Sequence, residues 1–235
     1  METVPSDLEH QIAGIAALNE PVRRALYVFV AEAGGDVSRD QAAEAVGISR
    51  ALAAFHLDKL VEESLLEARY QRLTGRSGPG AGRPSKLYRR SPQEIRVSLP
   101  PRRYELAARL FAQAVTRAAT AETIAALGET AHHFGTQLGA EARRRIGDGG
   151  DEAVIGAALS LLEAHGFEPL RTSRGEIVLR NCPFHPLACE HRDLVCGMNL
   201  AIMDGLVDGL GTSTLRAELT PQPGRCCVAF RRGQS

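Results

Sequence analysis

The sequence predicts an α+β protein, in which several N-terminal helices precede a two-stranded ribbon, a helical middle segment and a small C-terminal α+β domain. Helix caps followed by apolar residues at i, i+3, i+4 spacing predict the N-terminal helices. Alternating stretches on both sides of a Gly- and Pro-rich loop predict the ribbon. The 235 residues are 44% hydrophobic and 24% charged, which is the balance of a globular protein with a substantial core.

Four helices are predicted in the N-terminal quarter. The first covers residues 6–17 and is short, with Leu8, Ile12 and Ile15 near one face. End signals delimit the other three: Asn19 and Pro21 open a helix that Gly34 ends, Ser38 caps a helix over 39–45 that stops at Gly47, and Ser49 caps a helix to about Glu63.

The second and third capped helices are separated only by Val46-Gly47-Ile48, which is typical of a helix-turn-helix because the glycine permits the tight turn. Residues 65–73 then predict a strand, 75–84 a loop and 85–90 a returning strand, which together form a wing. We therefore expect a lead-in helix at 1–18 and a winged helix-turn-helix at 19–92.

Two further regions are expected after residue 92. Residues 93–150 contain long Ala- and Leu-rich helical patterns at 103–118 and 121–139, and we predict a helical dimerisation segment there. Residues 151–235 predict a small α+β domain; its elements are a helix at 152–165, strands at 168–173 and 176–181, a helix at 193–210, and strands at 215–219 and 226–231.

The net charge of zero conceals an uneven distribution of charge. Residues 1–67 hold five basic and twelve acidic side chains, whereas residues 68–91 hold seven basic side chains and no acidic one. A positive surface is what binding to DNA requires, so the predicted wing is the part expected to touch DNA. No segment has the pattern of a secretion signal or a membrane span, so we expect a cytoplasmic protein without a membrane partner.

The third capped helix is the expected recognition helix. Ala53, Leu57 and Leu60 form its buried stripe, which leaves Arg50 near the helix start to reach base edges in the major groove. His56 and Lys59 are expected at phosphates, with helix packing an equal alternative for His56. The full set of expected DNA contacts is Ser49, Arg50, His56, Lys59, Arg72, Arg76, Arg83 and Lys86. A purely protein-binding helix-turn-helix is the alternative.

Residues 46–60, with the His-Leu-x-x-Leu at the helix end, and the Gly-Arg-Pro-x-x-x-Tyr at 82–88 resemble the winged-helix domain of ArsR-type bacterial transcriptional regulators. The resemblance covers about residues 18–92. It implies a repressor that binds a double-stranded DNA operator as a homodimer.

Five cysteines occupy the last quarter of the chain: Cys182, Cys189, Cys196, Cys226 and Cys227. With His185 and His191 among them, they are the soft ligands that zinc and iron–sulfur clusters select. Their spacing is not that of a zinc finger, because no Cys-x2-Cys occurs. The His-x-Glu and Cys-x-x-Cys of zinc deaminases are absent as well, so we do not expect an enzyme.

The stretch Cys-Pro-Phe-x-x-Leu-Ala at 182–188, Val195-Cys196 and the distal cysteine resemble the sensor domain of the SufR-like iron–sulfur branch of these regulators. The resemblance implies Cys182, Cys196 and Cys226 as ligands of a cluster, expected to be [4Fe–4S], whose presence controls operator affinity. For the fourth ligand we expect His185, with Cys189, His191 and Cys227 as alternatives; on a strand Cys226 and Cys227 would face opposite sides.

Zinc is the alternative cofactor. It would make the protein a winged-helix regulator with a structural zinc site and a different effector, or none. A further alternative is an organic effector bound by the C-terminal domain, with the thiols incidental.

Overall fold

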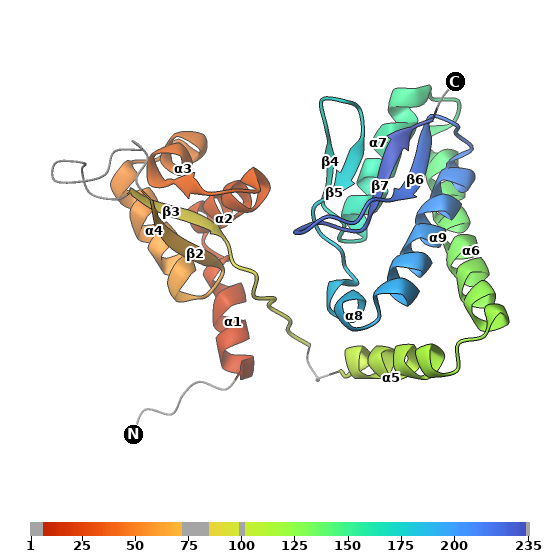
Figure 1. Cartoon of the computed structure of the whole chain (residues 1–235). Coiled ribbons are helices and arrows are strands. Elements are labelled where there is room, and N and C mark those ends of the chain that lie inside the picture. The colour runs from red at the N-terminus through yellow and green to blue at the C-terminus, as the bar shows by residue number, and fades with distance from the viewer. Residues whose placement is uncertain (1–6, 72–84, 99–101, 234–235) are drawn as a thin grey trace. The chain divides into compact units, whose positions relative to one another are not determined.

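The computed structural model describes residues 7–71, 85–98 and 102–233 and divides the chain into two compact units, residues 1–102 and 103–235 (Figure 1). Helices and two small antiparallel sheets make up the described residues, which confirms the α+β class. Arg72, Arg76 and Arg83, three of the expected DNA contacts, lie outside the described residues. No helix in the described part is long and apolar enough to cross a bilayer.

The first unit contains helices and a three-stranded sheet. In chain order its elements are α1 (Asp7–Ala17), α2 (Pro21–Ala33), β1 (Val37–Ser38), α3 (Arg39–Val46), α4 (Arg50–Glu62), β2 (Leu66–Gln71) and β3 (Ser85–Arg90). The strand order is β1-β3-β2, all antiparallel, with Ala68 opposite Tyr88. The short strand β1 was not predicted, because two residues are too few to form a pattern.

The ends of the helices follow from local hydrogen bonds. Ser38 and Gln41 form a capping box at the start of α3, and the Ser49 hydroxyl accepts a bond from the Leu52 amide at the start of α4. Gly47 ends α3 in the left-handed conformation, with φ of 71°. At α2 the cap is Glu20, within the expected Asn19-Glu20-Pro21, and its carboxylate accepts the bonds of two first-turn amides.

The core of the first unit confirms the predicted stripe of α4, since Ala53, Leu57 and Leu60 are fully buried. Helix α1 forms within the expected residues 6–17, but the face that carries Leu8, Ile12 and Ile15 is exposed, and the helix buries Gly14 and Ala17. Small residues form the buried face because the Ile95 side chain packs directly onto Gly14, where a Cβ would lie 2.5 Å from the Ile95 Cδ1.

The second unit is a four-stranded sheet with helices. Its elements are α5 (Tyr104–Arg117), α6 (Ala121–Ile146), α7 (Asp151–Ala164), β4 (Pro169–Arg171), β5 (Ile177–Leu179), α8 (His185–Glu190), α9 (Arg192–Leu210), β6 (Leu215–Leu219) and β7 (Val228–Arg232). The strand order is β4-β5-β7-β6, all antiparallel. Helix α8 was not predicted, and β7 begins two residues later than expected.

Helices α6 and α9 run parallel and touch backbone to backbone. A methyl group at Gly135 or Gly139 of α6 would collide with the carbonyl oxygen of Ile202 or Leu206 on α9. Gly205 and Gly209 of α9 are in the same position against the carbonyl oxygens of His132 and Thr136 on α6, so glycines spaced four apart on each helix allow an approach that side chains prevent.

Helix α9, which packs closely on α6, also contributes to the hydrophobic core of the second unit. Met203, Leu206 and Leu210 of α9 are buried in one apolar cluster with Ile177 and Phe230 of the sheet. Helix α9 packs against α6 and against the sheet, so contacts with both hold it in place. They thereby also hold the side chains near its N-terminal end in place.

We predict that Gly205→Ala lowers the free energy of unfolding by about 1–3 kcal/mol, since the methyl group would overlap backbone atoms that cannot rotate away. Gly128→Ala on α6 is the matched control: its Cβ would meet open space, so the better helix propensity of alanine should stabilise the protein by up to about 1 kcal/mol. Denaturant unfolding followed by circular dichroism measures both. Equal stability of Gly205→Ala and the wild type would contradict the close packing.

Candidate functional site

Two of the expected DNA contacts on α4 are exposed and paired with acids. The Arg50 side chain is 67% exposed, and its Nε lies 2.8 Å from Oδ1 of Asp40 on α3. The Lys59 Nζ lies 2.5 Å from Oε2 of Glu62. Exposed ion pairs of this kind are worth little, so both cations can exchange their partners for another anion at small cost.

Lys86 on β3 is more tightly held. Its Nζ and the Tyr88 hydroxyl both donate to Oδ1 of Asp58 on α4, at 2.6 and 2.7 Å. Burial opposes ionisation of Asp58, but the bonds from Lys86 and Tyr88 outweigh it and lower the pKa of the carboxyl. Burial and the bond to Asp58 raise the pKa of Tyr88. This network joins α4 to the sheet and fixes the direction of the helix.

His56 is buried, with only 7% of its surface exposed. Its Nδ1 lies 3.7 Å from Oε2 of Glu20, the residue that caps α2, and its ring contacts the edge of Phe55. The packing alternative for His56 is therefore the one that its position favours over a phosphate contact.

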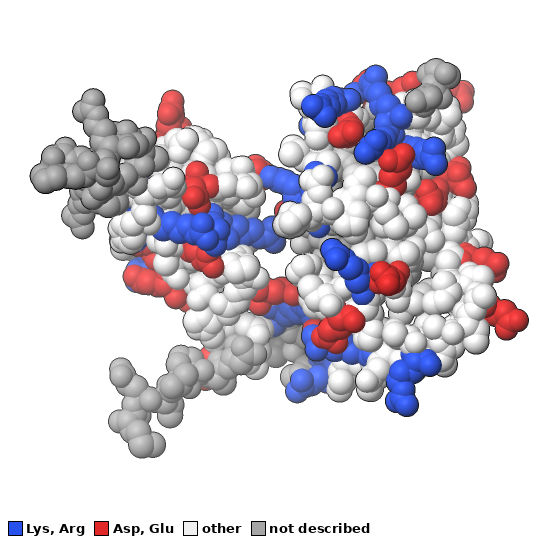
Figure 2. Space-filling view, viewed as in Figure 1, with Lys and Arg blue, Asp and Glu red and all other residues white. Residues whose placement is uncertain are grey.

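Figure 2 shows a band of Lys and Arg side chains over strands β2 and β3, with acidic side chains beside it. Helix α4 exposes Leu52 and Phe55, which the sequence analysis did not single out. Both lie outside the buried stripe of α4, and this position in the helical pattern could have identified them as exposed apolar residues.

Four of the five cysteines come together in the second unit. Cys182 follows β5, Cys196 lies in α9, and Cys226 and Cys227 precede β7, so three separate segments supply them. The Cys182 and Cys227 thiols both donate to the Cys226 sulfur, and the Cys227 thiol is also hydrogen-bonded to Cys196. Cys226 and Cys227 are buried in the core, and Cys182 and Cys196 pack against it. We call this group the thiol cluster.

The expectation that Cys226 and Cys227 face opposite sides of a strand was wrong. The strand β7 begins only at Val228, and the chain bends at Cys227. Both sulfurs therefore contact the same cluster, although each residue still bonds to a neighbouring segment: the Cys226 amide to the Leu179 carbonyl, and the Cys227 carbonyl to the Thr220 amide.

The cluster favours a thiolate at Cys226. The hydrogen bond from Cys182 lowers the pKa of Cys226 most, with further bonds from the Val228 amide and Asn199, and these effects exceed the opposing effect of burial. The bond to Cys226 and burial raise the pKa of Cys182, and burial and the bond to Cys196 raise that of Cys227. One sulfur thus carries the charge that its neighbours stabilise.

Asn199, one turn after Cys196 on α9, was missed by the sequence analysis. Its side chain is buried, and its Nδ2 donates to the Cys226 Sγ at 3.3 Å. Its Oδ1 is buried without a hydrogen-bond partner. An unsatisfied buried polar atom costs about 1–3 kcal/mol, so packing alone does not explain an asparagine at this position.

The remaining candidate ligands have other partners. The His185 Nε2 lies 3.7 Å from the Sγ of Cys189, one turn away on α8, and the His191 Nδ1 lies 3.1 Å from the Thr116 hydroxyl of α5. Among the candidates for a fourth ligand, Cys227 is the one that is hydrogen-bonded to Cys196 and Cys226.

Within the described residues, no three His, Cys, Asp or Glu side chains are already arranged around a point that could hold one metal ion. The donor set nevertheless fits a soft metal or an iron–sulfur cluster in its chemistry, because four thiols from three segments lie together and one of them favours the thiolate form. Binding would require the hydrogen-bonded thiols to lose protons and separate around the metal.

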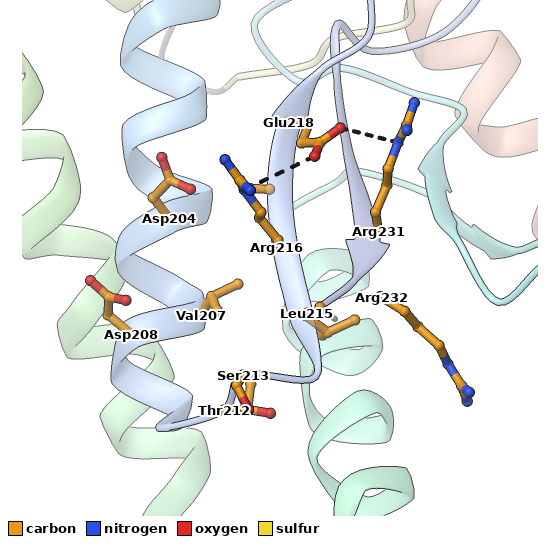
Figure 3. Close-up of a pocket in the computed structure, with 12 residues that line it drawn as sticks. Asp204, Val207, Asp208, Thr212, Ser213, Leu215, Arg216, Glu218, Arg231 and Arg232 are labelled. Carbon is orange, nitrogen blue, oxygen red and sulfur yellow. Dashed lines mark ion pairs between the residues drawn. The ribbon is translucent and has the colours of Figure 1, made fainter. Parts of the chain in front are cut away.

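A hollow of about 650 Å³ lies between α9, β6 and the end of β7. Figure 3 shows Asp204 and Asp208 on its helical wall and Arg216 on the strand opposite. Glu218 bridges Arg216 and Arg231, with oxygens 4.0 and 3.1 Å from their Nε atoms. Burial and the charge of Asp208 raise the pKa of Asp204.

In comparisons with family models, curated proteins and solved structures, nothing matches this chain. The functional conclusion therefore depends on the site itself.

We predict that the reduced, metal-free protein gains one thiolate as the pH rises through about 6, the pKa of Cys226. Because this pKa is lowered on folding, the ionised Cys226 stabilises the fold at high pH, and that contribution disappears as the pH falls through about 6. Thiolate absorbance in the ultraviolet measures the step. Cys226→Ser should abolish it, whereas Cys189→Ser, at an exposed thiol outside the cluster, should retain it. A titration without the step at Cys226 would contradict the hydrogen-bond pattern.

Proposed function

We propose that the protein is a DNA-binding transcriptional regulator, acting as a repressor, whose operator affinity is controlled by an iron–sulfur cluster or another soft metal at the thiol cluster. The observation that carries the proposal is the convergence of Cys182, Cys196, Cys226 and Cys227 from three segments. Apolar residues would fill a core without the reactivity of thiols towards oxidants and metals, whereas four adjacent thiols suit the binding of a soft metal.

The first unit supports the DNA-binding part of the proposal. Helices α3 and α4, joined by a turn at Gly47, and the antiparallel pair β2–β3 follow the order of a winged helix-turn-helix. We propose α4 as the recognition helix, with its stripe at Ala53, Leu57 and Leu60 buried and its opposite face offered to the major groove.

Arg50 has the central role in the proposed DNA contact. It stands at the first position of α4, and its guanidinium can exchange the Asp40 carboxylate for the two acceptors of a guanine edge. Lys59 would exchange Glu62 for a phosphate in the same way, whereas Lys86 would keep Asp58 and hold the strand β3 against α4. The exposed Phe55 suits contact with a thymine methyl group.

The helix α5 supports homodimerisation. It exposes four large apolar side chains, and those of Tyr104 and Phe111 are 76% and 72% exposed. Large apolar groups gathered on one exposed helix indicate an interaction surface. A second copy of the chain is the proposed partner, because a repressor that reads two half-sites needs two copies of α4 at a fixed spacing.

The proposed ligands are Cys182, Cys196, Cys226 and Cys227, with Cys227 replacing His185 as the fourth because Cys227 touches both Cys196 and Cys226. When bound, the group supplies sensitivity to oxidants or to the supply of iron. The chain's own residues supply the coupling: binding changes the spacing of the three segments that carry the four sulfurs, and needs to favour one arrangement of the protein by only about 1–3 kcal/mol.

We predict that Arg50→Ala weakens binding to a duplex that the wild type selects from a random-sequence library by about 1–3 kcal/mol, and relaxes the preference at one base pair. Asp40→Asn should strengthen binding, because it removes the carboxylate that competes for Arg50. Fluorescence anisotropy measures the affinities. Arg174→Ala, at an exposed arginine in the turn between β4 and β5, serves as the control, and an Arg50→Ala protein that binds like this control would remove Arg50 from the interface.

We predict that protein purified without oxygen contains iron and sulfide and shows a broad visible absorption band, and that Cys182→Ser, Cys196→Ser, Cys226→Ser and Cys227→Ser each lose it. Removal of the cluster should weaken operator binding by at least about fivefold, the lower end of ordinary coupling between sites. Equal affinities before and after removal would refute the control by a cluster.

Two other results identify the alternatives. A colourless protein with one zinc per chain, whose second unit unfolds on chelation while DNA affinity shows no graded change, indicates a structural zinc site. A protein without metal whose DNA affinity responds to an organic molecule, with the response lost in Asp204→Asn, indicates an effector in the hollow beside α9.

A further inference from the structure

Asn199 is the one polar residue, cysteines apart, that is buried in the described core of the second unit. It is 1% exposed, and its surroundings on α9 are apolar, with Val195 and Met203 one turn before and one turn after it. The side chain forms one hydrogen bond, from Nδ2 to the Cys226 Sγ at 3.3 Å, while its Oδ1 has no partner.

Packing does not account for this arrangement. A leucine at position 199 would fill a similar volume without burying an unpartnered oxygen, so the asparagine lowers the stability of the metal-free protein. A residue that is unfavourable for folding and is directed at one particular sulfur is expected where a site needs it.

We propose that Asn199 is a positioning residue of the thiol cluster, which holds the Cys226 sulfur in the orientation of a metal ligand. The proposal rests on the proposed metal-binding function. The amide N–H of Asn199 stabilises negative charge on the Cys226 sulfur. Asn199 and Cys196 lie on the same side of α9, three residues apart. The helix therefore fixes one proposed ligand, Cys196, together with the residue that orients another, Cys226.

Two consequences distinguish this role from ordinary packing. Loss of the amide N–H should weaken metal binding, because the thiolate loses a donor that orients it. It should also lower the reduction potential of a bound cluster, because reduction adds negative charge that the hydrogen bond to sulfur stabilises.

The test compares Asn199→Leu and Asn199→Asp with the wild type as full-length, reduced, metal-free proteins. Leucine removes the donor and keeps the approximate volume; aspartate keeps the shape and places a carboxylate beside the sulfur. Co²⁺ is the probe, since its charge-transfer absorption reports thiolate ligation directly, and a competing chelator gives the dissociation constant. Met203→Leu, one turn further along the buried side of α9, is the matched control.

We expect Asn199→Leu to raise the Co²⁺ dissociation constant about 10- to 100-fold, in the range found when an outer-shell partner of a metal ligand is removed. Asn199→Asp should raise it further, and Met203→Leu should leave it unchanged. Unfolding of metal-free Asn199→Leu should require as much denaturant as the wild type or more. After reconstitution with Fe²⁺ and sulfide, both Asn199 variants should show a lower reduction potential.

Co²⁺ binding and potential at wild-type values in Asn199→Leu would overturn the proposal. If that variant does not fold, Asn199→Asp decides the question by the same measurements. A wild-type protein that binds neither Co²⁺ nor a cluster would overturn both this inference and the proposed function. A wild-type protein that binds Co²⁺ through Asn199-dependent thiolates, but whose DNA affinity ignores the metal, would leave the role of Asn199 standing and refute only the regulation.

Discussion

The backbones of α6 and α9 are in direct contact, and the geometry of the thiol cluster depends on that contact. Four glycines allow it, at positions 135 and 139 of α6 and 205 and 209 of α9, and we call this contact the glycine seam. The seam fixes α9, which carries Cys196 and Asn199. The other face of α9 packs on the sheet whose strand β7 directly follows Cys226 and Cys227. A displacement of α9 by the width of one methyl group would therefore disturb the hydrogen bonds from Cys196 and Asn199 to the other two cysteines.

The two units differ in where their charged groups lie and in what stabilises them. In the first unit, the described cations of the proposed DNA surface have carboxylate partners, so the free protein holds its positive side chains in place at little energetic cost. In the second unit, charge at the thiol cluster is buried and concentrated on one sulfur that four neighbouring groups stabilise by hydrogen bonds. The first arrangement suits rapid exchange with an external polyanion, and the second suits a group held for a long time.

The sequence predicted the elements well where local chemistry determines them. Ser38, Gly47 and Ser49 marked the ends of α3 and α4 because caps and left-handed turns depend on neighbouring residues. It was less informative where distant residues decide: Ile95 packs on Gly14 in the buried face of α1, and the Cys226 amide and Cys227 carbonyl bond to other segments next to the bend at Cys227. The site was predictable as a set of residue types. Three of its four members, Cys182, Cys196 and Cys226, were expected, but Cys227 was only an alternative, because tertiary contacts bring it into the cluster. His185 lies beside Cys189 because both are on helix α8, which was not predicted.

The glycine seam has a consequence for finding relatives of this chain. Positions 135, 139, 205 and 209 each admit a single amino acid at this helix separation, so the two Gly-x-x-x-Gly spacings, read together, form a fingerprint of the geometry that does not depend on overall similarity. A diverged sequence with both spacings and the four cysteines would have the same helix pair. A sequence with alanine at any of the four positions would need a wider separation, and its cysteines would have to be placed differently.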